Sequence, residues 1–309
     1  MAIDLRAAFF VCAVAGSVSL AGCGFDPKTP FTKEGQFNLA LQYENGTGGR
    51  TRDEREAARL FKLAADEGLA EAQVDLGLFY ATGRGGLAHD QREAVRYYKM
   101  AADQGNAVGQ YDLACDYELG VGGLPKDDAQ AARLYKLSAD QGYESAQFNL
   151  GNLYFNGRGG LPRDPREAAR LYRLSAAKGD AHAQSQLAFF YHDGLGGLPV
   201  DLRESVRLYK LAAAQGHANA QYNLAHMYSH GEAGPPDDRE AARLYKLAAE
   251  QGHADAQNNL GMFYEKGRGG LPVDKAEALR LYGLSAAQND PAGKANLAGL
   301  TAAERRAGK

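Results

Sequence analysis

The chain has 309 residues, of which 45% are apolar and 24% are charged, a balance typical of a folded globular protein rather than a disordered or membrane-spanning one. Its 35 basic and 38 acidic residues nearly cancel, so there is no surplus of positive charge of the kind that nucleic acid requires, and we expect no nucleic-acid partner. The 38 glycines recur at regular distances instead of forming a linker, which indicates a repeat.

The first segment reads as a leader. Residues 7–20 are an unbroken run of apolar and small residues, long enough for a signal-peptide core and too short to cross a bilayer as a helix. The run ends in Leu20-Ala21-Gly22-Cys23, which resembles the lipobox of bacterial lipoproteins. We therefore expect residues 1–22 to be a signal peptide, Cys23 to carry a lipid, and residues 23–32 to be a tether.

An exported protein without lipid stays open as the alternative, because the only basic residue before the apolar run is Arg6 and Asp4 offsets it. By the same resemblance, Gly24 stands where an aspartate would favour the inner membrane. The expected location is thus the bacterial cell envelope, lipid-anchored in the outer membrane and facing the periplasm. Cleavage before Cys23 would remove Cys12 and leave Cys115 as the one other thiol, so packing must hold the fold without a disulfide.

A repeat of 37 residues organises the rest of the chain. It is marked by a glutamine at Gln36, Gln73, Gln110, Gln147, Gln184, Gln221 and Gln257, with Lys294 in the next register. A tyrosine follows seven residues after each glutamine, and a glycine three residues after the tyrosine. The one interval of 36 residues falls where the loop 231–236 is a residue shorter than its counterparts, and a surface loop is where a deletion is tolerated.

Each unit is predicted to be a helix, a glycine loop and a second helix. In the fourth unit, Gly157 is placed to end the first helix in the left-handed conformation, and Asp164 with Glu167 forms a capping box at the start of the second. In that box the aspartate accepts a backbone N–H and the glutamate reaches back. The second helix should stop at Gly179, and Asn289 replaces the equivalent glycine in the seventh unit.

The pattern Ala-x-x-x-Leu-Gly-x-x-Tyr-x-x-Gly-x-Gly, followed by Asp-x-x-Glu-Ala-x-Arg-Leu-Tyr-Lys-Leu-Ala-Ala-x-Gln-Gly, resembles the Sel-one-like repeat, a relative of the tetratricopeptide repeat. The resemblance implies an all-α fold: a right-handed α-solenoid of seven helix-turn-helix repeats over residues 33–291, with a capping helix and tail over residues 292–309. It also implies a non-catalytic adaptor or scaffold that binds a protein or peptide partner. We expect a monomer with no cofactor.

Columns that stay constant between units are predicted to pack, and columns that vary are predicted to be available for binding. Positions one, five and eight after each glutamine vary and lie on one side of the first helix. They carry many apolar and aromatic side chains, among them Phe37, Val74, Leu41 and Leu78 in the first two units. The residues proposed to line a binding groove on the concave side are Tyr111, Phe148, Asn152, Phe155, Phe189, His192, Tyr222, His226 and Met262. The alternative is that these side chains complete the packing between repeats.

Other patterns suggest chemistry more weakly. Ser175 and Lys178 have the serine-lysine spacing of penicillin-binding enzymes, so a cell-wall or β-lactam-directed hydrolase is the alternative function, but the column of Ser175 requires only a small packed residue. His192, His226 and His230 could converge on a metal ion. Because no carboxylate or thiol has a matching spacing, we favour groove-lining or solvated histidines and expect no metal.

Overall fold

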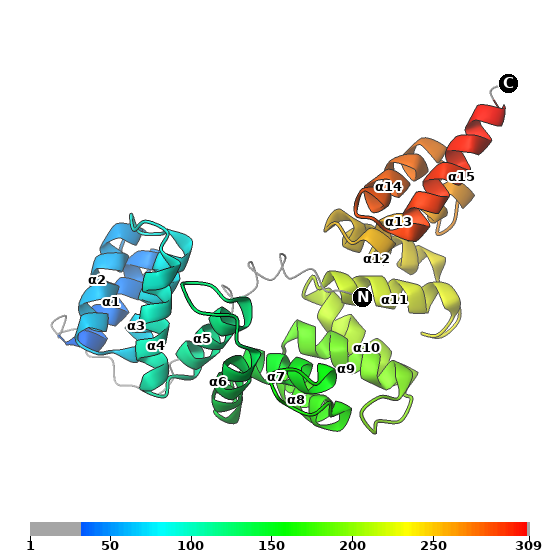
Figure 1. The fold of residues 1–309 in the computed structure, drawn as a ribbon. Coiled ribbons are helices and arrows are strands. Elements are labelled where there is room, and N and C mark those ends of the chain that lie inside the picture. Colours follow the sequence, from blue (N-terminus) through cyan, green and yellow to red (C-terminus); the bar gives the residue numbers. More distant parts are fainter. Residues whose placement is uncertain (1–31, 308–309) are drawn as a thin grey trace.

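The computed structural model describes residues 32–307, and this part of the chain folds into fifteen α-helices without a strand (Figure 1). The expected α-solenoid is confirmed. The first helices of the seven units are α1 (Lys33–Asn45), α3 (Ala70–Thr82), α5 (Ala107–Leu119), α7 (Glu144–Asn156), α9 (Ala181–Asp193), α11 (Ala218–His230) and α13 (Ala254–Lys266). The second helices are α2 (Glu54–Asp66), α4 (Gln91–Asp103), α6 (Asp128–Asp140), α8 (Pro165–Ala177), α10 (Leu202–Ala214), α12 (Asp238–Glu250) and α14 (Lys275–Ala287).

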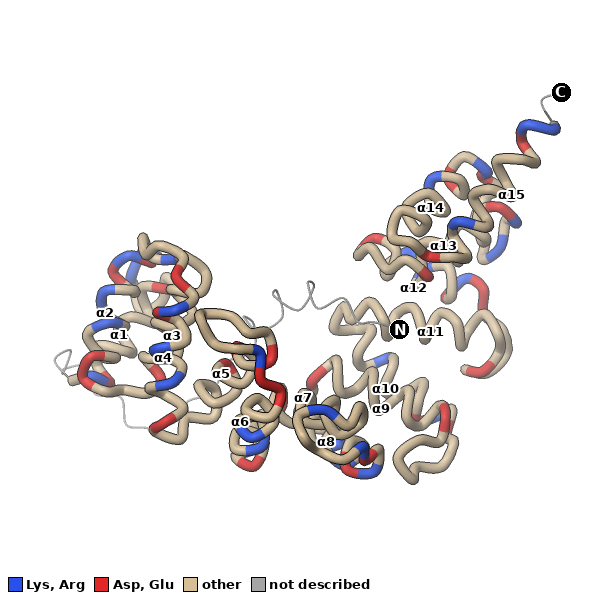
Figure 2. Tube along the Cα trace, viewed as in Figure 1, with Lys and Arg blue, Asp and Glu red and all other residues tan. Residues whose placement is uncertain are grey.

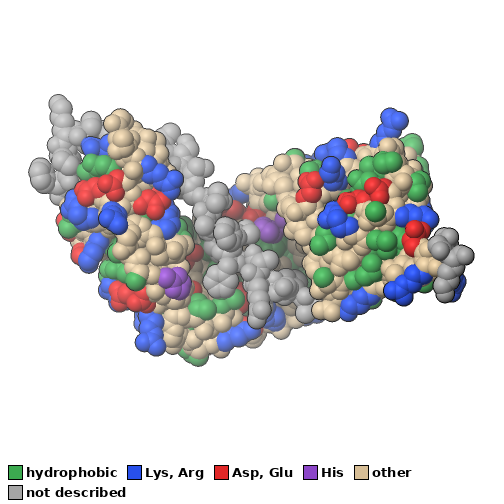
Figure 3. All heavy atoms as spheres, turned by 90° about the horizontal axis from the view of Figure 1, so that it is seen from above, with side chains coloured by type: hydrophobic (Ala, Val, Ile, Leu, Met, Phe, Trp, Pro, Cys, Tyr) green, Lys and Arg blue, Asp and Glu red, His purple; other side chains and the backbone are tan. Residues whose placement is uncertain are grey.

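Each first helix packs against the second helix of its own unit and against the second helix of the unit before it. The units consequently form a curved row that runs from α1 to α15, and a hollow separates the two ends of the row (Figures 1 and 3). The last helix, α15 (Pro291–Ala307), packs on α14 and α13 and buries Leu300 there. It covers the apolar face that the seventh unit would otherwise expose, as a capping helix must.

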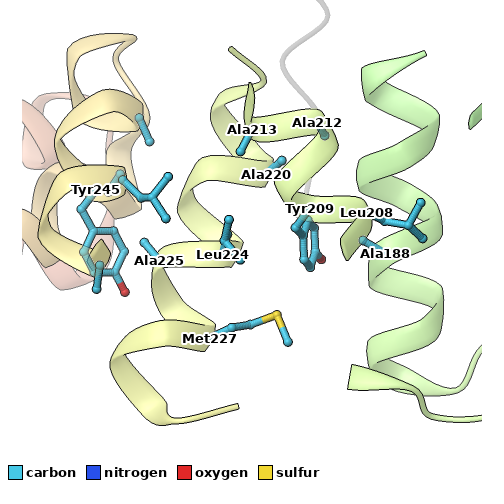
Figure 4. Close-up of a cluster of buried hydrophobic side chains, with 14 of the residues drawn as sticks. Ala188, Leu208, Tyr209, Ala212, Ala213, Ala220, Leu224, Ala225, Met227 and Tyr245 are labelled. Carbon is cyan, nitrogen blue, oxygen red and sulfur yellow. The ribbon is translucent and has the colours of Figure 1, made fainter. Parts of the chain in front are cut away.

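The core is a continuous ribbon of small and large side chains in fixed columns. Figure 4 shows it between α9 and α12, where Ala188 and Ala225 lie beside the larger Tyr209, Leu224 and Tyr245. The small residues at these positions of the first helix allow the aromatic ring of the paired second helix to approach closely. In the fourth unit, a Cβ added to Gly151 would lie only 2.7 Å from the ring of Tyr172, which is fully buried. The helix pair could not close to this distance with a larger residue.

Each second helix begins at its aspartate cap. The carboxylates of Asp53, Asp90, Asp127, Asp164, Asp201, Asp237 and Asp274 accept the N–H of the residue three positions on, at 2.9–3.2 Å. The prediction that the glutamate completes a capping box is wrong. Glu167 instead accepts from Arg170 at 2.7 Å, and the backbone N–H of Asp164 donates to the carbonyl of Tyr154 at 2.8 Å. A carbonyl of the preceding helix therefore accepts the backbone N–H that the glutamate side chain was expected to bind.

The same glutamate–arginine pair recurs along the outer surface of the second helices, as in Glu56–Arg59 and Glu240–Arg243. Basic and acidic residues consequently alternate along the chain, and neither sign gathers on one element (Figure 2). These pairs are exposed, so each contributes only about 0.3–0.5 kcal/mol to the free energy of folding.

Helix ends depend on left-handed residues, as predicted. Gly157 ends α7 with φ 66°, and its N–H donates to the carbonyl of Leu153. Beyond α8, Gly179 has φ 97°. Asn289 takes the equivalent place after α14 with φ 66° and is the one residue other than glycine with positive φ in the described chain. Asparagine tolerates this conformation better than most residues, which explains the single replacement.

The repeated glutamines form a buried ladder of amides, a role that the spacing alone did not reveal. Gln73 is 1% exposed; its Nε2 donates to the carbonyl of Ala65 on α2 at 3.2 Å. Its Oε1 accepts from Gln104, which follows α4, at 2.7 Å. One side chain thus joins three successive helices. In the third, fifth, sixth and seventh units, a glutamine that follows the second helix likewise donates to the ladder glutamine. These donors are Gln141, Gln215, Gln251 and Gln288, in that order.

The fourth unit breaks this ladder. Lys178 occupies the place of the donor glutamine, and its Nζ contacts the carbonyl of Gly142. The Oε1 of Gln147, which is buried, is left without a hydrogen-bond partner in the described structure. A buried acceptor without a partner costs free energy, so this unit is less stable than its neighbours at the α7–α8 contact.

Replacing Lys178 with glutamine should therefore stabilise the protein. The new Nε2 would reach Gln147 and also the carbonyl of Gly142, as Gln215 does with Gln184 and Gly179 one unit later. We expect a gain of about 0.5–1.5 kcal/mol in the free energy of unfolding, measured by urea denaturation followed by circular dichroism. Lys210→Gln removes the same charge from an exposed position of α10 and is the matched control. Equal effects of the two substitutions would contradict the role given to the ladder.

Candidate functional site

The candidate residues on the first helices are arranged in a row from α5 to α13, and most of them are half-buried. Tyr111 is the exception. It is 7% exposed, with its ring centroid 5.8 Å from Tyr135 and 5.1 Å from Tyr143. Its contacts are those of a residue that packs one unit on the next, and Val74 at the same position of the second unit is likewise only 8% exposed. Tyr111 therefore offers little surface to a ligand, and the row of accessible rings begins at α7.

Phe148 and Tyr222 occupy the same position as Tyr111 but keep part of their surface accessible. The ring of Phe148 lies 5.8 Å from Tyr172 and 5.6 Å from the imidazole of His182. Tyr222 stacks on His253, with 4.6 Å between the ring centroids and 19° between the planes. Each ring is thus held between its own second helix and the start of the next unit, which fixes its orientation.

The residues five and eight positions after each repeat glutamine add further contacts and further accessible surface to the row. Asn152 accepts a hydrogen bond from the hydroxyl of Tyr172 at 2.7 Å. Phe155 lies 5.3 Å from the ring of Phe190, whereas Phe189, next to that buried ring, is half-buried on the adjoining face. Met262 packs against the cluster that α14 and α15 form. We name the half-buried set Phe148, Asn152, Phe155, Phe189, His192, Tyr222, His226 and Met262 the aromatic stripe.

The histidines at the start of the first helices lie near turns and are nevertheless half-buried. His217 caps α11: its Nδ1 accepts the N–H of Ala220 at 3.2 Å, so its Nε2 carries the proton and faces Nδ1 of His182 at 3.0 Å. His253 caps α13 in the same manner. Burial, and to a smaller extent the nearby His182 and His253, lowers the pKa of His217 to about 4. This role could not be predicted from the residue type, because histidine is not a preferred cap.

A second group of histidines lies at the other end of α9 and α11. The Nε2 of His192 is 2.9 Å from Glu232, and its Nδ1 contacts Asp193. Burial opposes the charged imidazole, but these two carboxylates outweigh burial and raise the pKa of His192. Burial and the adjacent His230 lower the pKa of His226. The pKa values of two neighbouring imidazoles in one stripe are thus shifted in opposite directions.

The serine-lysine pair has no geometry for catalysis. Ser175 is fully buried in the packed face of α8, and Lys178 is directed to the carbonyl of Gly142. A substrate could not reach the hydroxyl while the helix stays packed. Cys115 is half-buried, 3.2 Å from the hydroxyl of Tyr135, which also lies 2.9 Å from a carboxylate oxygen of Glu118.

Comparison with known proteins agrees with this geometry. The profile of the Sel1 repeat matches seven successive segments: residues 33–69, 70–106, 107–143, 144–180, 181–217, 218–253 and 254–290. The chain belongs to the Sel1 repeat family. Sel1 repeat proteins are generally non-catalytic scaffolds that bind other proteins, and the tetratricopeptide relationship is consistent with the helix pairs seen here.

Two solved Sel1-type structures are similar over most of the chain. A protective antigen present in uropathogenic Escherichia coli strains, which displays an SLR fold, has 34% identity and a TM-score of 0.69 over 87% of this chain and 56% of the other. This chain thus spans little more than half the length of that antigen. A Sel1 repeat protein from Oxalobacter formigenes has 30% identity and a TM-score of 0.66 over 87% of this chain and 76% of the other. The search of curated proteins gave no match.

The proposed leader, tether and lipidation site Cys23 lie outside the described residues. Within residues 32–307, none of the helices combines the length and the apolar character needed to cross a bilayer.

The half-buried capping side chain of His217 should make stability depend on pH. Its pKa is about 4 in the folded chain against 6.5 for an ordinary histidine, so protonation favours the unfolded chain between these values. As the pH falls from 7 to 4, wild type should lose about 2–3 kcal/mol more free energy of unfolding than His217→Asn, which keeps a capping side chain. Urea denaturation at each pH measures this difference. His89→Asn, in an exposed loop, should retain the wild-type profile; parallel curves for wild type and His217→Asn would disprove the assignment.

Proposed function

We propose that this Sel1 repeat protein is a scaffold or adaptor of the bacterial cell envelope that holds an extended segment of a partner protein along the aromatic stripe. The observation that carries the proposal is the difference between columns. Residues that are constant from unit to unit, such as the ladder glutamines, are buried in the packing between helices. The residues of the stripe vary from unit to unit and keep accessible surface. Variation without loss of packing is what a recognition surface needs.

The spacing of the stripe suits an extended ligand. Neighbouring helices pack about 8–10 Å apart, and an extended chain advances about 3.3 Å per residue, so successive units would meet about every third residue of the partner. The rings of Phe148 and Tyr222 are already oriented by contacts within the solenoid, and little side-chain entropy would be lost when a ligand covers them. Asn152 and the histidines add polar groups that could fix the ligand's direction.

The envelope location rests on the sequence alone. An apolar run that ends in Leu20-Ala21-Gly22-Cys23 supports a lipid on Cys23 and a position on the periplasmic side of the outer membrane. A lipid-anchored solenoid would be confined near that membrane and would raise the local concentration of its partner there. We propose a single chain as the active unit.

The alternative, a cell-wall or β-lactam-directed hydrolase, has no support in the geometry of its one candidate pair. The hydroxyl of Ser175 is inaccessible, and Lys178 contacts a backbone carbonyl instead of the serine. A general base must lie within hydrogen-bond distance of the nucleophile that it activates. We therefore propose a non-catalytic role.

The stripe can be tested by photo-crosslinking in cells. A photoreactive phenylalanine analogue at Phe189 should crosslink to a discrete partner, because this half-buried position faces the proposed ligand. The same analogue at Leu174, which is 42% exposed on the second helix of the preceding unit, is the matched control and should yield no such product. Mass spectrometry identifies the partner. Crosslinking to the same protein from both positions would place the interface elsewhere.

Alanine variants then test the energetic contribution of the rings. The triple variant Phe148→Ala, Phe189→Ala and Tyr222→Ala should abolish capture of the identified partner while circular dichroism stays helical. Since Phe148 and Tyr222 also touch buried tyrosines, Phe189→Ala alone is the variant least able to disturb the fold, and a loss of about tenfold or more in affinity is expected from it. A helical triple variant with unchanged affinity would refute the proposed groove.

The lipid anchor gives a separate prediction. Cys23→Ser should move the protein from the membrane fraction to the soluble fraction of the envelope and abolish labelling by radioactive palmitate. Cys115→Ser keeps the proposed anchor and should stay with the membrane. If the Cys23→Ser protein remained membrane-bound, anchoring through this residue would be excluded.

A further inference from the structure

Each second helix carries one long apolar side chain on its solvent side, among charged residues. In five units this side chain is a leucine that is 40–42% exposed: Leu63, Leu137, Leu174, Leu211 and Leu284. These leucines follow, by four residues, the arginine that recurs in every second helix. Because the leucines are alike in exposure, the charges around each of them decide what could contact it.

The fourth and fifth units differ from most others in the charges around this leucine. Three positions after the apolar residue, the first, second, third and sixth units have an acid: Asp66, Asp103, Asp140 and Glu250. The same position is Ala177 in α8 and Ala214 in α10. The seventh unit also has an alanine there, but Gly283 replaces the basic residue before its leucine. Only α8 and α10 therefore keep the basic residues and lose this acid.

The result is a local surplus of positive charge, although basic and acidic residues alternate along the second helices. α8 carries three arginines and one acid, and α10 carries two arginines, one lysine and one acid. In α2, α6 and α12 the two signs are equal in number. Glu167 and Glu204 each pair with the arginine three residues on, at 2.7 Å. In the part of the chain that the structure describes, no ion pair includes the remaining cations, which are Arg166, Arg173, Arg203 and Lys210.

These cations and the two leucines form one continuous surface. On α8 the cations and Leu174 have the spacing i, i+4, i+7 and i+8, which defines one helical face, and α10 repeats this spacing up to Leu211. α9 packs against both helices, so their outer faces are neighbours in the layer of second helices (Figure 1). We name the basic patch the exposed set Arg166, Arg170, Arg173, Leu174, Arg203, Arg207, Lys210 and Leu211.

We propose that the basic patch binds a lipid surface with anionic headgroups. The whole chain has a formal net charge of −3, so attraction to such a surface has to come from a local surplus of positive charge. Arginine and lysine side chains bind phosphate oxygens, and the leucines between them can enter the apolar layer below the headgroups. An acidic protein segment would satisfy the cations and leave Leu174 and Leu211 with no apolar partner, which favours lipid.

The basic patch and the aromatic stripe belong to different layers of the solenoid. The stripe lies on the first helices and the basic patch on the second helices, so a partner and a lipid surface could be bound at once. Two leucines bury little apolar area, and the contact should depend mainly on charge and weaken with salt. The proposal depends neither on the stripe nor on a lipid at Cys23, although a lipid there would strengthen the attachment.

Sedimentation with lipid vesicles tests the basic patch. The protein is the chain from residue 23 with Cys23→Ser, which lacks the proposed leader and lipid and keeps all fifteen described helices. We expect it to sediment with vesicles of phosphatidylglycerol and phosphatidylcholine in equal parts, and to stay in solution with pure phosphatidylcholine. Raising the NaCl concentration to about 0.5 M should release it, because salt screens exposed charges.

Glutamine variants locate the contact. The triple variant Arg166→Gln, Arg173→Gln and Lys210→Gln should lower the partition coefficient by about tenfold or more. The matched control carries Arg239→Gln, Lys246→Gln and Lys136→Gln, which remove the same charge from the same positions of α12 and α6, where acids balance the cations. It should bind within about twofold of the parent protein. Circular dichroism verifies that both variants stay helical.

Serine variants separate lipid from other anionic partners. The pair Leu174→Ser and Leu211→Ser should weaken vesicle binding, whereas Leu63→Ser with Leu137→Ser, of matching exposure, should not. The proposal fails if the protein does not bind phosphatidylglycerol vesicles, if both triple variants lose binding equally, or if the pair Leu174→Ser and Leu211→Ser binds as the parent protein does. Binding of polyglutamate without binding of vesicles would assign the basic patch to an acidic protein instead.

Discussion

The stacking of this solenoid depends on one buried amide per unit. A column of alanines, leucines and tyrosines supplies most of the burial, but apolar packing alone is not directional. The ladder glutamine adds direction, because Gln73 has to meet a carbonyl of α2 and a donor that follows α4 at the same time. A helix that slid or rotated would leave a polar group buried without a partner, which costs about 1–3 kcal/mol. The register between units is thereby fixed.

This arrangement divides the labour within each unit. Constant positions determine the packing, the helix ends and the register. They are the tyrosine whose carbonyl accepts the backbone N–H of the capping aspartate, the left-handed glycines and the ladder glutamine. The remaining positions of the first helix can then change without loss of fold. Asn152 and Phe189 are accordingly unlike their counterparts in other units, while their backbones follow the same path. A scaffold can diverge in its partners for this reason, with one architecture retained.

Most of the fold could be predicted from the sequence because its determinants are local and repeated. Seven copies of the aspartate and glycine signals gave the helix ends, and Asn289 was recognised as a left-handed residue from its column alone. What failed were contacts supplied by another element. The carbonyl of Tyr154 took the donor expected to bind Glu167, and packing between helices buried Tyr111. Likewise, Glu232 approaches His192 through the stacking of units, although 40 residues separate them in the chain.

The lysine that interrupts the ladder has a mechanical consequence. In an array whose units touch only their neighbours, strain concentrates where the cohesion between helices is least. Apart from Gln36 in the first unit, Gln147 is the one ladder glutamine of the described chain whose oxygen has no partner, and its α7–α8 contact stands midway along the row with three units on either side. Each side thus holds the three repeats that a stable array needs at least. Under tension the chain would then yield first at its centre and extend as two blocks, like a hinged arm instead of a rigid rod.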